Sequence, residues 1–141
     1  MKINQLATIM KYSPLVYMGY IFRTTKPGLG IVEEMKKIAA NIWNQKFVYI
    51  NMAACDMYDV YLMKVQYRNE PVTYFFDGME SISDTMRNDI LTAFSINRTD
   101  NIHNESHVIY NSNEYENSEY YKVDDWNEYV TLHGMCLKIE P

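Results

Sequence analysis

Short apolar runs alternate with segments of helical periodicity along this chain, and this alternation constrains the fold more than any other feature. Five runs have strand character: Leu15–Phe22, Lys46–Met52, Val72–Asp77, His107–Asn111 and Met135–Ile139. The most apolar of them are typical of strands covered on both faces, as in parallel sheets. Because strands that alternate with helices build βαβ units, the order predicts an α/β fold with a mostly parallel sheet flanked by helices.

The clearest helix lies between the first two predicted strands. Within Glu33–Gln45, four apolar residues follow the i, i+3, i+4, i+7 spacing of one helix face: Met35, Ile38, Ala39 and Ile42. Acidic residues stand at the start of this segment, where the helix dipole favours negative charge. The stretch Lys26–Gly30, just before it, has the composition of a turn. The sequence therefore predicts a strand, a glycine-containing turn and a helix in succession.

Three further segments have helical spacing, namely Ile3–Met10, Ser83–Phe94 and Asp124–Leu132. The serine that opens the second of these is a predicted N-cap. Cys55–Val65 mixes aspartates with apolar residues at no clean period, so the sequence leaves its structure open. Two polar, asparagine-rich stretches are predicted loops: Asn97–Ser106 and Ser112–Tyr121.

Size and charge predict one compact domain over residues 1–141. A chain of 141 residues that is 48% hydrophobic can bury a real core and is too short for two comfortable domains. The net charge of −5 comes mostly from interspersed acids and bases, so we expect no nucleic-acid partner. No apolar run approaches the ~18 residues of a membrane span, and the start has no secretory pattern. A soluble, cytoplasmic protein without membrane contact is expected.

The cysteines and histidines show no metal-binding or disulfide pattern. Cys55 and Cys136 are far apart in sequence, and neither belongs to a CxxC pair. The histidines, which are His103, His107 and His133, lack the spacing of metal ligands. We therefore expect buried free thiols and predict neither a metal nor a cofactor.

A phosphate-binding loop is suggested by the turn after the first predicted strand. The segment Thr25–Val32 reads TKPGLGIV, with Pro27, Gly28 and Gly30 at the positions of the proline and two glycines in the Walker A pattern GxPGxGK[ST]. A helix follows directly, as it does in such loops. This segment resembles the Walker A loop of the AAA+ branch of the P-loop NTPases.

Later landmarks resemble the same family in the same order. VTYFFDGMES is similar to a Walker B strand, with Asp77 at the acid that helps to hold magnesium. HVIYNSN is similar to the strand that carries the sensor 1 asparagine, with Asn111 at that position and Asn113 as the alternative. WNEYVTLHGMCLKIEP resembles the stretch that closes the α/β base. The resemblance is nearest to the MoxR-like branch and implies a P-loop NTPase-like AAA+ base in a single small domain.

The residues that would carry nucleotide chemistry depart from the family pattern. Ile31 and Val32 stand where the lysine that contacts the phosphates and the hydroxyl that binds magnesium should be. Thr25 replaces the first glycine, and Gly78 replaces the glutamate that activates water. The resemblance therefore implies a pseudo-NTPase that is not an enzyme and takes no cofactor. The turn is expected to remain as a structural link between strand and helix.

Neighbouring groups are not expected to restore the chemistry. Lys26 precedes the glycines, and Glu80 would reach the catalytic position only if the chain bulged by two residues. Near the last strand, His133 and Gly134 stand where AAA+ domains commonly carry an arginine that acts on a neighbouring subunit's nucleotide. The sequence ends at Pro141, before the length of a helical lid, so the resemblance implies a base without its lid.

The acid of the Walker B-like strand needs partners other than a metal in such a site. We expect Asp77 to be partly buried and to accept hydrogen bonds from backbone N–H groups of the Gly28–Ile31 turn or from Asn111, because an isolated buried carboxylate is too costly. The loop resemblance also predicts positive φ at one of the turn glycines. Because Ile31 and Val32 begin the helix, replacing them by Lys and Thr is expected to leave the fold intact.

The expected role is that of a protein-interaction module. AAA+ subunits assemble by heterologous contacts, so a subunit-like chain without the chemistry could bind an ATPase subunit and act as an inhibitor or regulator. The small size and the many asparagines, tyrosines and methionines are typical of phage or mobile-element genes, which fits an anti-defence role. Tyr115, Tyr120 and Tyr121 are the expected contact patch.

Two other functions stay open at this point. An unrelated α/β domain that binds a ligand, or a metal-dependent enzyme, would use Asp56, Asp59 and Asp77 as an acidic site near strand ends. Alternatively, the thirteen tyrosines provide a surface typical of interfaces, which favours a homodimer or a structural virion component.

Overall fold

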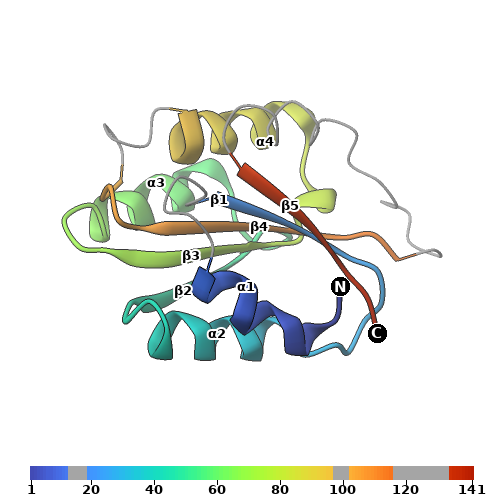
Figure 1. The fold of residues 1–141 in the computed structure, drawn as a ribbon. Coiled ribbons are helices and arrows are strands. Elements are labelled where there is room, and N and C mark those ends of the chain that lie inside the picture. The colour runs from blue at the N-terminus through green and yellow to red at the C-terminus, as the bar shows by residue number, and fades with distance from the viewer. Residues whose placement is uncertain (13–18, 97–101, 116–133) are drawn as a thin grey trace.

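A computed structural model describes residues 1–12, 19–96, 102–115 and 134–141 (Figure 1). The described part of the chain contains five strands, and helical segments alternate with most of them. In chain order the elements are η1 (Ile3–Gln5), α1 (Leu6–Tyr12), β1 (Gly19–Thr24), α2 (Ile31–Asn41), β2 (Lys46–Asn51), α3 (Met57–Gln66), β3 (Val72–Asp77), η2 (Met79–Ser81), α4 (Asp84–Leu91), the π-helical η3 (Thr92–Ile96), β4 (His107–Asn113) and β5 (Gly134–Ile139).

The five strands form one parallel sheet in the order β2-β3-β4-β1-β5. This confirms the predicted α/β fold with a parallel sheet flanked by helices. Because β4 lies between β1 and β3, the carboxyl ends of these three strands are neighbours at one edge of the sheet. In the register, Asn111 of β4 lies opposite Asp77 of β3 on one side and Phe22 of β1 on the other.

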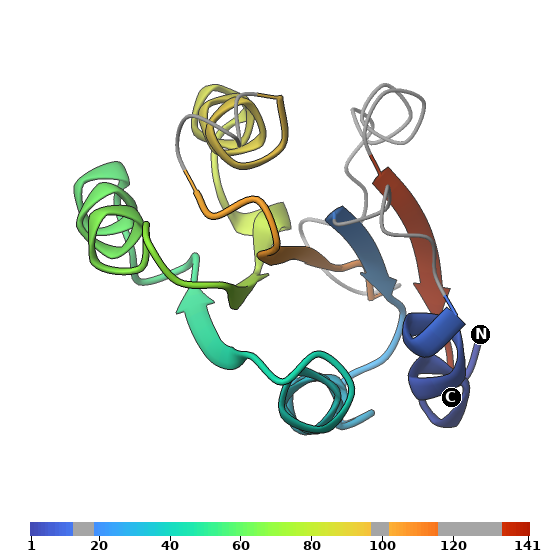
Figure 2. The ribbon, with the colours of Figure 1, turned by 60° about the vertical axis from the view of Figure 1, so that its left-hand side comes forward.

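Helices cover both faces of the sheet, with α1 and α2 on one face and α3 and α4 on the other (Figures 1 and 2). Each face has its own apolar core, as alternate strand residues point to opposite sides. Under α1 and α2 the buried side chains include Phe22, Phe75 and Ile109. Under α3 and α4 they include Phe76 and Tyr110. This double burial explains why the strands read as nearly continuous apolar runs.

Several predicted boundaries move in the structure. The strand β1 ends at Thr24, two residues after its predicted end at Phe22. The helix α2 begins at Ile31, two residues before the predicted start, and Ile31 belongs to the buried core. The strand β4 continues to Asn113, so the loop predicted from Ser112 starts later. The predicted helix at residues 124–132 lies outside the described residues.

The ambiguous segment forms the helix α3. Asp56 is its N-cap, and its side chain accepts a hydrogen bond of 3.0 Å from the backbone N–H of Asp59. The Asp59 side chain accepts in return from the backbone N–H of Asp56, at 3.1 Å. The two aspartates of this capping box, three residues apart, are a sequence signal for a helix start. The prediction missed it because the segment has no clear apolar period. The predicted N-cap of α4 is confirmed, because the Ser83 hydroxyl accepts from the Met86 N–H.

The turn between β1 and α2 depends on left-handed glycines, as predicted. Gly28 has φ of 74° and Gly30, which caps α2, has φ of 76°. Both cysteines are free, as expected, but Cys55 and Cys136 are partly exposed rather than buried. Among the described helices, none is long and apolar enough to cross a membrane.

Replacing Gly28 or Gly30 by Ala should lower the free energy of unfolding by about 1 kcal/mol, because an L side chain is disfavoured at these φ values. Steric crowding is not the cause. A Cβ at Gly28 would meet no atom within 4 Å, and one at Gly30 would meet only a Glu33 carboxylate oxygen at 3.9 Å. Urea unfolding measures the effect. Asn, which tolerates the left-handed region, is the matched control and should cost less than Ala. Wild-type stability of both Ala variants would contradict the turn geometry.

Candidate functional site

A row of polar side chains crosses the sheet at the carboxyl ends of four strands. The Thr24 hydroxyl of β1 donates to Asn111 Oδ1 at 2.6 Å, and Asn111 Nδ2 of β4 donates to Asp77 Oδ1 at 2.8 Å. The Tyr49 hydroxyl of β2 donates to the other carboxylate oxygen of Asp77 at 2.7 Å. These residues continue the strand positions that face α1 and α2. Asp77 is half-buried, and its predicted bond from Asn111 is confirmed.

Asn113 adds a second amide to this row. Its Nδ2 lies 3.3 Å from Asp77 Oδ1 and 3.1 Å from Glu80 Oε1. Its Oδ1 accepts from Asn111 Nδ2 at 3.1 Å and from the Tyr115 hydroxyl at 3.2 Å. Within the described residues, the backbone N–H groups of the turn at 28–31 are not partners of Asp77, so that alternative expectation is wrong. We call Asp77, Glu80, Asn111, Asn113, Tyr49 and Tyr115 the carboxyl-end cluster.

Glu80 reaches this cluster without the bulge that the sequence argument required. The chain leaves β3 at Gly78, whose φ is 90° and whose N–H donates to the Asn111 carbonyl at 3.1 Å. The short helix η2 then turns the chain back, so that Glu80 lies beside Asp77 and bonds Asn113. In the sequence, the glycine directly after the strand is the signal for this chain reversal. Glycine adopts the left-handed conformation that the reversal needs.

The electrostatics of the cluster raise the pKa of one of its carboxyl groups, that of Glu80. Burial raises the pKa of Glu80, the charge of Asp77 raises it further, and hydrogen bonds from Asn113 oppose the increase. Glu80 Oε2 is buried and has no hydrogen-bond partner among the described residues. Two carboxyl groups that share a partly buried site resist being ionised together. The cluster therefore has the features of a proton-binding site as well as those of a structural network.

Two tyrosines close the cluster at its sides. Burial and then the hydrogen bond to Asp77 raise the pKa of Tyr49 to about 12. Burial, followed by the charges of Asp77 and Glu80, also raises the pKa of Tyr115. Tyr115 is half-buried against Asn113, which corrects its assignment to an exposed contact patch. Tyr120 and Tyr121 lie outside the described residues.

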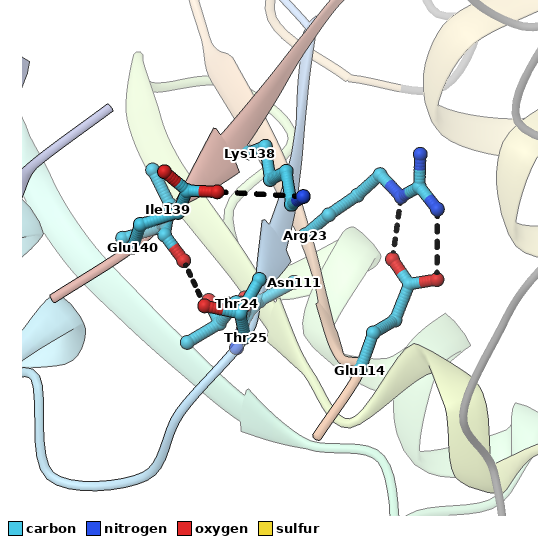
Figure 3. A network of polar contacts seen from close by, with 8 residues as sticks. All are labelled: Arg23, Thr24, Thr25, Asn111, Glu114, Lys138, Ile139 and Glu140. Carbon is cyan, nitrogen blue, oxygen red and sulfur yellow. Dashed lines mark hydrogen bonds and ion pairs between the residues drawn. The ribbon is translucent and has the colours of Figure 1, made fainter. Parts of the chain in front are cut away.

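The end of β1 is held from both sides (Figure 3). Arg23 donates two hydrogen bonds to the buried carboxylate of Glu114, from Nε at 2.6 Å and from a terminal nitrogen at 3.1 Å. On the other side, the Thr25 hydroxyl donates to the Ile139 carbonyl of β5 at 2.9 Å. Thr25 thus fixes the turn to β5.

The residues at the lysine and hydroxyl positions pack rather than face a ligand. Ile31 is 8% exposed and belongs to the core under α1 and α2. Val32 is half-buried and packs against the same core. Pro27 and Lys26 are exposed in the turn. The turn therefore has left-handed glycines, and the side chains at the two positions compared with the Walker A lysine and hydroxyl are apolar.

The three-aspartate site that was one alternative is not assembled. Asp56 and Asp59 form the capping box of α3, and within the described residues neither is hydrogen-bonded to Asp77. Across residues 1–12, 19–96, 102–115 and 134–141, no group of three or more histidine, cysteine or acidic side chains could hold a metal. Neither a scan of protein-family models nor a search of curated protein sequences found a match to this chain.

The pH dependence of stability tests the assignment of Glu80. Because its folded pKa is raised, its stabilising contribution is present below the unfolded pKa of about 4.3 and is lost as pH rises through the folded value. Glu80→Gln removes this loss, so the melting temperature of the variant should gain on that of the wild type between acidic and neutral pH. Exposed Glu70, replaced by Gln, is the matched control. A constant offset at every pH would contradict the raised pKa.

Proposed function

We propose that this chain is a degenerate AAA+ base domain of the MoxR-like type that does not hydrolyse nucleotide and acts as a protein-interaction module. The support is the meeting of three family-like landmarks at one edge of the sheet. The glycine turn follows β1, Asp77 ends β3, and Asn111 of β4 joins them through bonds to Thr24 and Asp77. An active site of this kind needs the first, third and fourth strands side by side, and here they are neighbours.

The burial of Ile31 is the observation that carries the proposal of inactivity. A working loop needs a lysine that reaches the β- and γ-phosphates, and an aliphatic side chain packed in the core supplies no such charge. Val32 supplies no hydroxyl for magnesium. Glu80 returns a carboxylate to the cluster, but it replaces only one of the missing groups. Asp77, for its part, already accepts hydrogen bonds from Asn111 and Tyr49.

The proposed partner is a subunit of an active AAA+ ATPase. Such subunits join by heterologous contacts, in which one face meets a different face of the next subunit. A chain with the base fold and without the nucleotide chemistry would occupy one such contact and not contribute to hydrolysis. We propose an inhibitor or regulator of this type, encoded by a phage or mobile element and acting in the cytoplasm.

ATP with magnesium should not raise the melting temperature of the protein, since the lysine and hydroxyl positions hold Ile31 and Val32. A ligand that binds only the folded state at 100 times its dissociation constant adds about 2.7 kcal/mol, which a thermal melt detects readily. A clear upward shift at millimolar ATP would overturn the proposal of inactivity.

The burial of Ile31 changes the expected effect of restoring the Walker A residues at positions 31 and 32. Because Ile31 is buried, Ile31→Lys should destabilise the fold rather than leave it intact, by burying an ammonium group near a helix N-terminus. Val32→Thr, at a half-buried position, is the milder companion. ATP should not stabilise either variant.

Affinity capture from the native host, with mass spectrometry, tests the partner. Recovery of an intact AAA+ ATPase supports the proposal, and recovery of nucleic acid alone contradicts it. The captured ATPase should then hydrolyse ATP at a different rate when the purified chain is added. Heat-denatured chain is the control, and an unchanged rate with the folded chain would remove the regulatory role.

A second candidate function is that of an unrelated α/β domain with ligand-binding or enzymatic chemistry at Asp77 and Glu80. The observation that favours it is the buried Oε2 of Glu80, which has no hydrogen-bond partner among the described residues, together with the raised pKa of this group. A carboxyl group with a raised pKa beside a second carboxyl group is an arrangement suited to proton transfer. Loss of an activity in Glu80→Gln, with the fold retained, would favour this candidate over the pseudo-NTPase.

A further inference from the structure

The helix α3 exposes a stripe of large apolar side chains. Of the six exposed large hydrophobic residues in the described part of the chain, four lie on this helix: Tyr58 (68% exposed), Tyr61 (49%), Leu62 (53%) and Val65 (70%). Their i, i+3, i+4, i+7 spacing places them on one face. We call these four residues the α3 stripe. Exposed apolar residues that are scattered singly need no explanation, but a contiguous set of this kind marks an interaction surface.

The opposite face of α3 packs against the core of the protein. Val60 is buried in the core of its side of the sheet, and Met57, Met63 and Tyr67 pack against that core. The helix is therefore apolar on two faces, which is the reason that its sequence has no clean period. Figure 2 shows α3 at the outside of the molecule, on the side of the sheet where β2 is the edge strand. The α3 stripe is thus accessible to another molecule.

We propose that the α3 stripe binds a second copy of this chain, with the two α3 helices antiparallel about a two-fold axis. The spacing of the stripe is self-complementary. An axis that passes midway between Tyr61 and Leu62 brings Tyr61 opposite Leu62 of the second copy. The same axis brings Tyr58 opposite Val65 of the second copy, so each pair joins an aromatic ring to an aliphatic side chain. An isologous contact requires this kind of symmetry.

The charges at the two ends of α3 favour the same orientation. The helix begins at acidic residues, Asp56 and Asp59, and its basic residues, Lys64 and Arg68, follow at its carboxyl end. In the antiparallel pair, the acidic first turn of one copy lies at the level of the basic last turn of the other, while the Lys64 ammonium itself lies over the Tyr61 and Phe94 rings of its own chain. The helix dipoles also oppose each other. A parallel pair would instead bring like charges together, so the charges select the antiparallel arrangement.

This inference goes beyond the proposed function and does not depend on it. It rests on the exposure, spacing and end charges of α3, whereas the proposed function rests on the turn after β1 and on the carboxyl-end cluster. Four side chains on a ten-residue helix make a small contact, whereas stable interfaces bury at least about 1,200 Å² in total. The dimer should therefore dissociate on dilution.

Sedimentation velocity on the full chain, from micromolar to several hundred micromolar, measures the association. The wild type should shift from the monomer mass to the dimer mass as its concentration rises. Tyr58→Glu and Leu62→Glu should remain monomeric, because they place carboxylates in an apolar contact. The matched control is Tyr12→Glu on α1, where the tyrosine is 73% exposed, and this variant should dimerise like the wild type. Circular dichroism melts show that each variant is folded.

Cysteine pairs test the antiparallel register. With both native cysteines, which are free, replaced by Ser, Leu62→Cys should form a disulfide-linked dimer on mild oxidation, since Leu62 lies beside the axis. Val65→Cys alone should not form this disulfide. Position 65 faces position 58 of the second copy, so the two positions 65 are seven residues apart, about 10 Å along the helix axis. Disulfides need Cα atoms within about 7 Å. Tyr58→Cys mixed with Val65→Cys should link.

Each of three results would overturn the proposed antiparallel dimer. The first is a wild type that stays monomeric at the highest concentration. The second is a dimer that survives Tyr58→Glu and Leu62→Glu, which would show that another surface is used. The third is Val65→Cys linking as readily as Leu62→Cys, which would contradict the antiparallel register. A thermal shift with ATP would refute the proposed inactivity and leave this test unaffected.

Discussion

The hydrogen bonds of Asn111 organise the carboxyl edge of the sheet. This side chain is 1% exposed, accepts from Thr24 of β1 and donates to Asp77 of β3, while its backbone carbonyl accepts from the N–H of Gly78. Side chain and backbone of this one residue thus satisfy polar groups at the ends of β1 and β3 and at the turn after β3. A buried amide that lost these partners would leave unpaired groups at a cost of about 1 to 3 kcal/mol each. The direction of Asp77, the reversal at Gly78 and the position of Glu80 all depend on it.

The same network explains how an acid is accommodated at the end of β3, where the described residues form no metal-binding group. Asp77 receives hydrogen bonds from an amide and a phenol, so its charge is stabilised by neutral donors instead of a cation. Glu80 lies next to this carboxylate, and its pKa is raised first by burial and then by the charge of Asp77. The cluster serves stability in the pseudo-NTPase proposal and proton transfer in the alternative, and both depend on this pair.

The two faces of α3 connect the fold to association. Its inner face belongs to the core that also contains Phe76 and Tyr110, while its outer face carries the α3 stripe. A helix with one apolar face shows a clear apolar period in its sequence, whereas a helix with two apolar faces does not. The segment that resisted assignment from sequence is therefore the one for which we propose a partner. The missing apolar period of residues 55–65 therefore reflects a helix that has apolar residues on two faces.

Local patterns in the sequence determined the strands, the N-cap at Ser83 and the left-handed turn, because backbone preferences and apolar periodicity act over a few residues. Val72–Asp77 is predicted with both ends correct, and the bond between Asp77 and Asn111 was expected from the order of the landmarks. Tertiary structure alone decided the remainder. Tyr49 meets Asp77 only because β2 pairs with β3, and Ile31 is buried only because α2 packs on the sheet. Such contacts join residues distant in the chain, and no local preference specifies them.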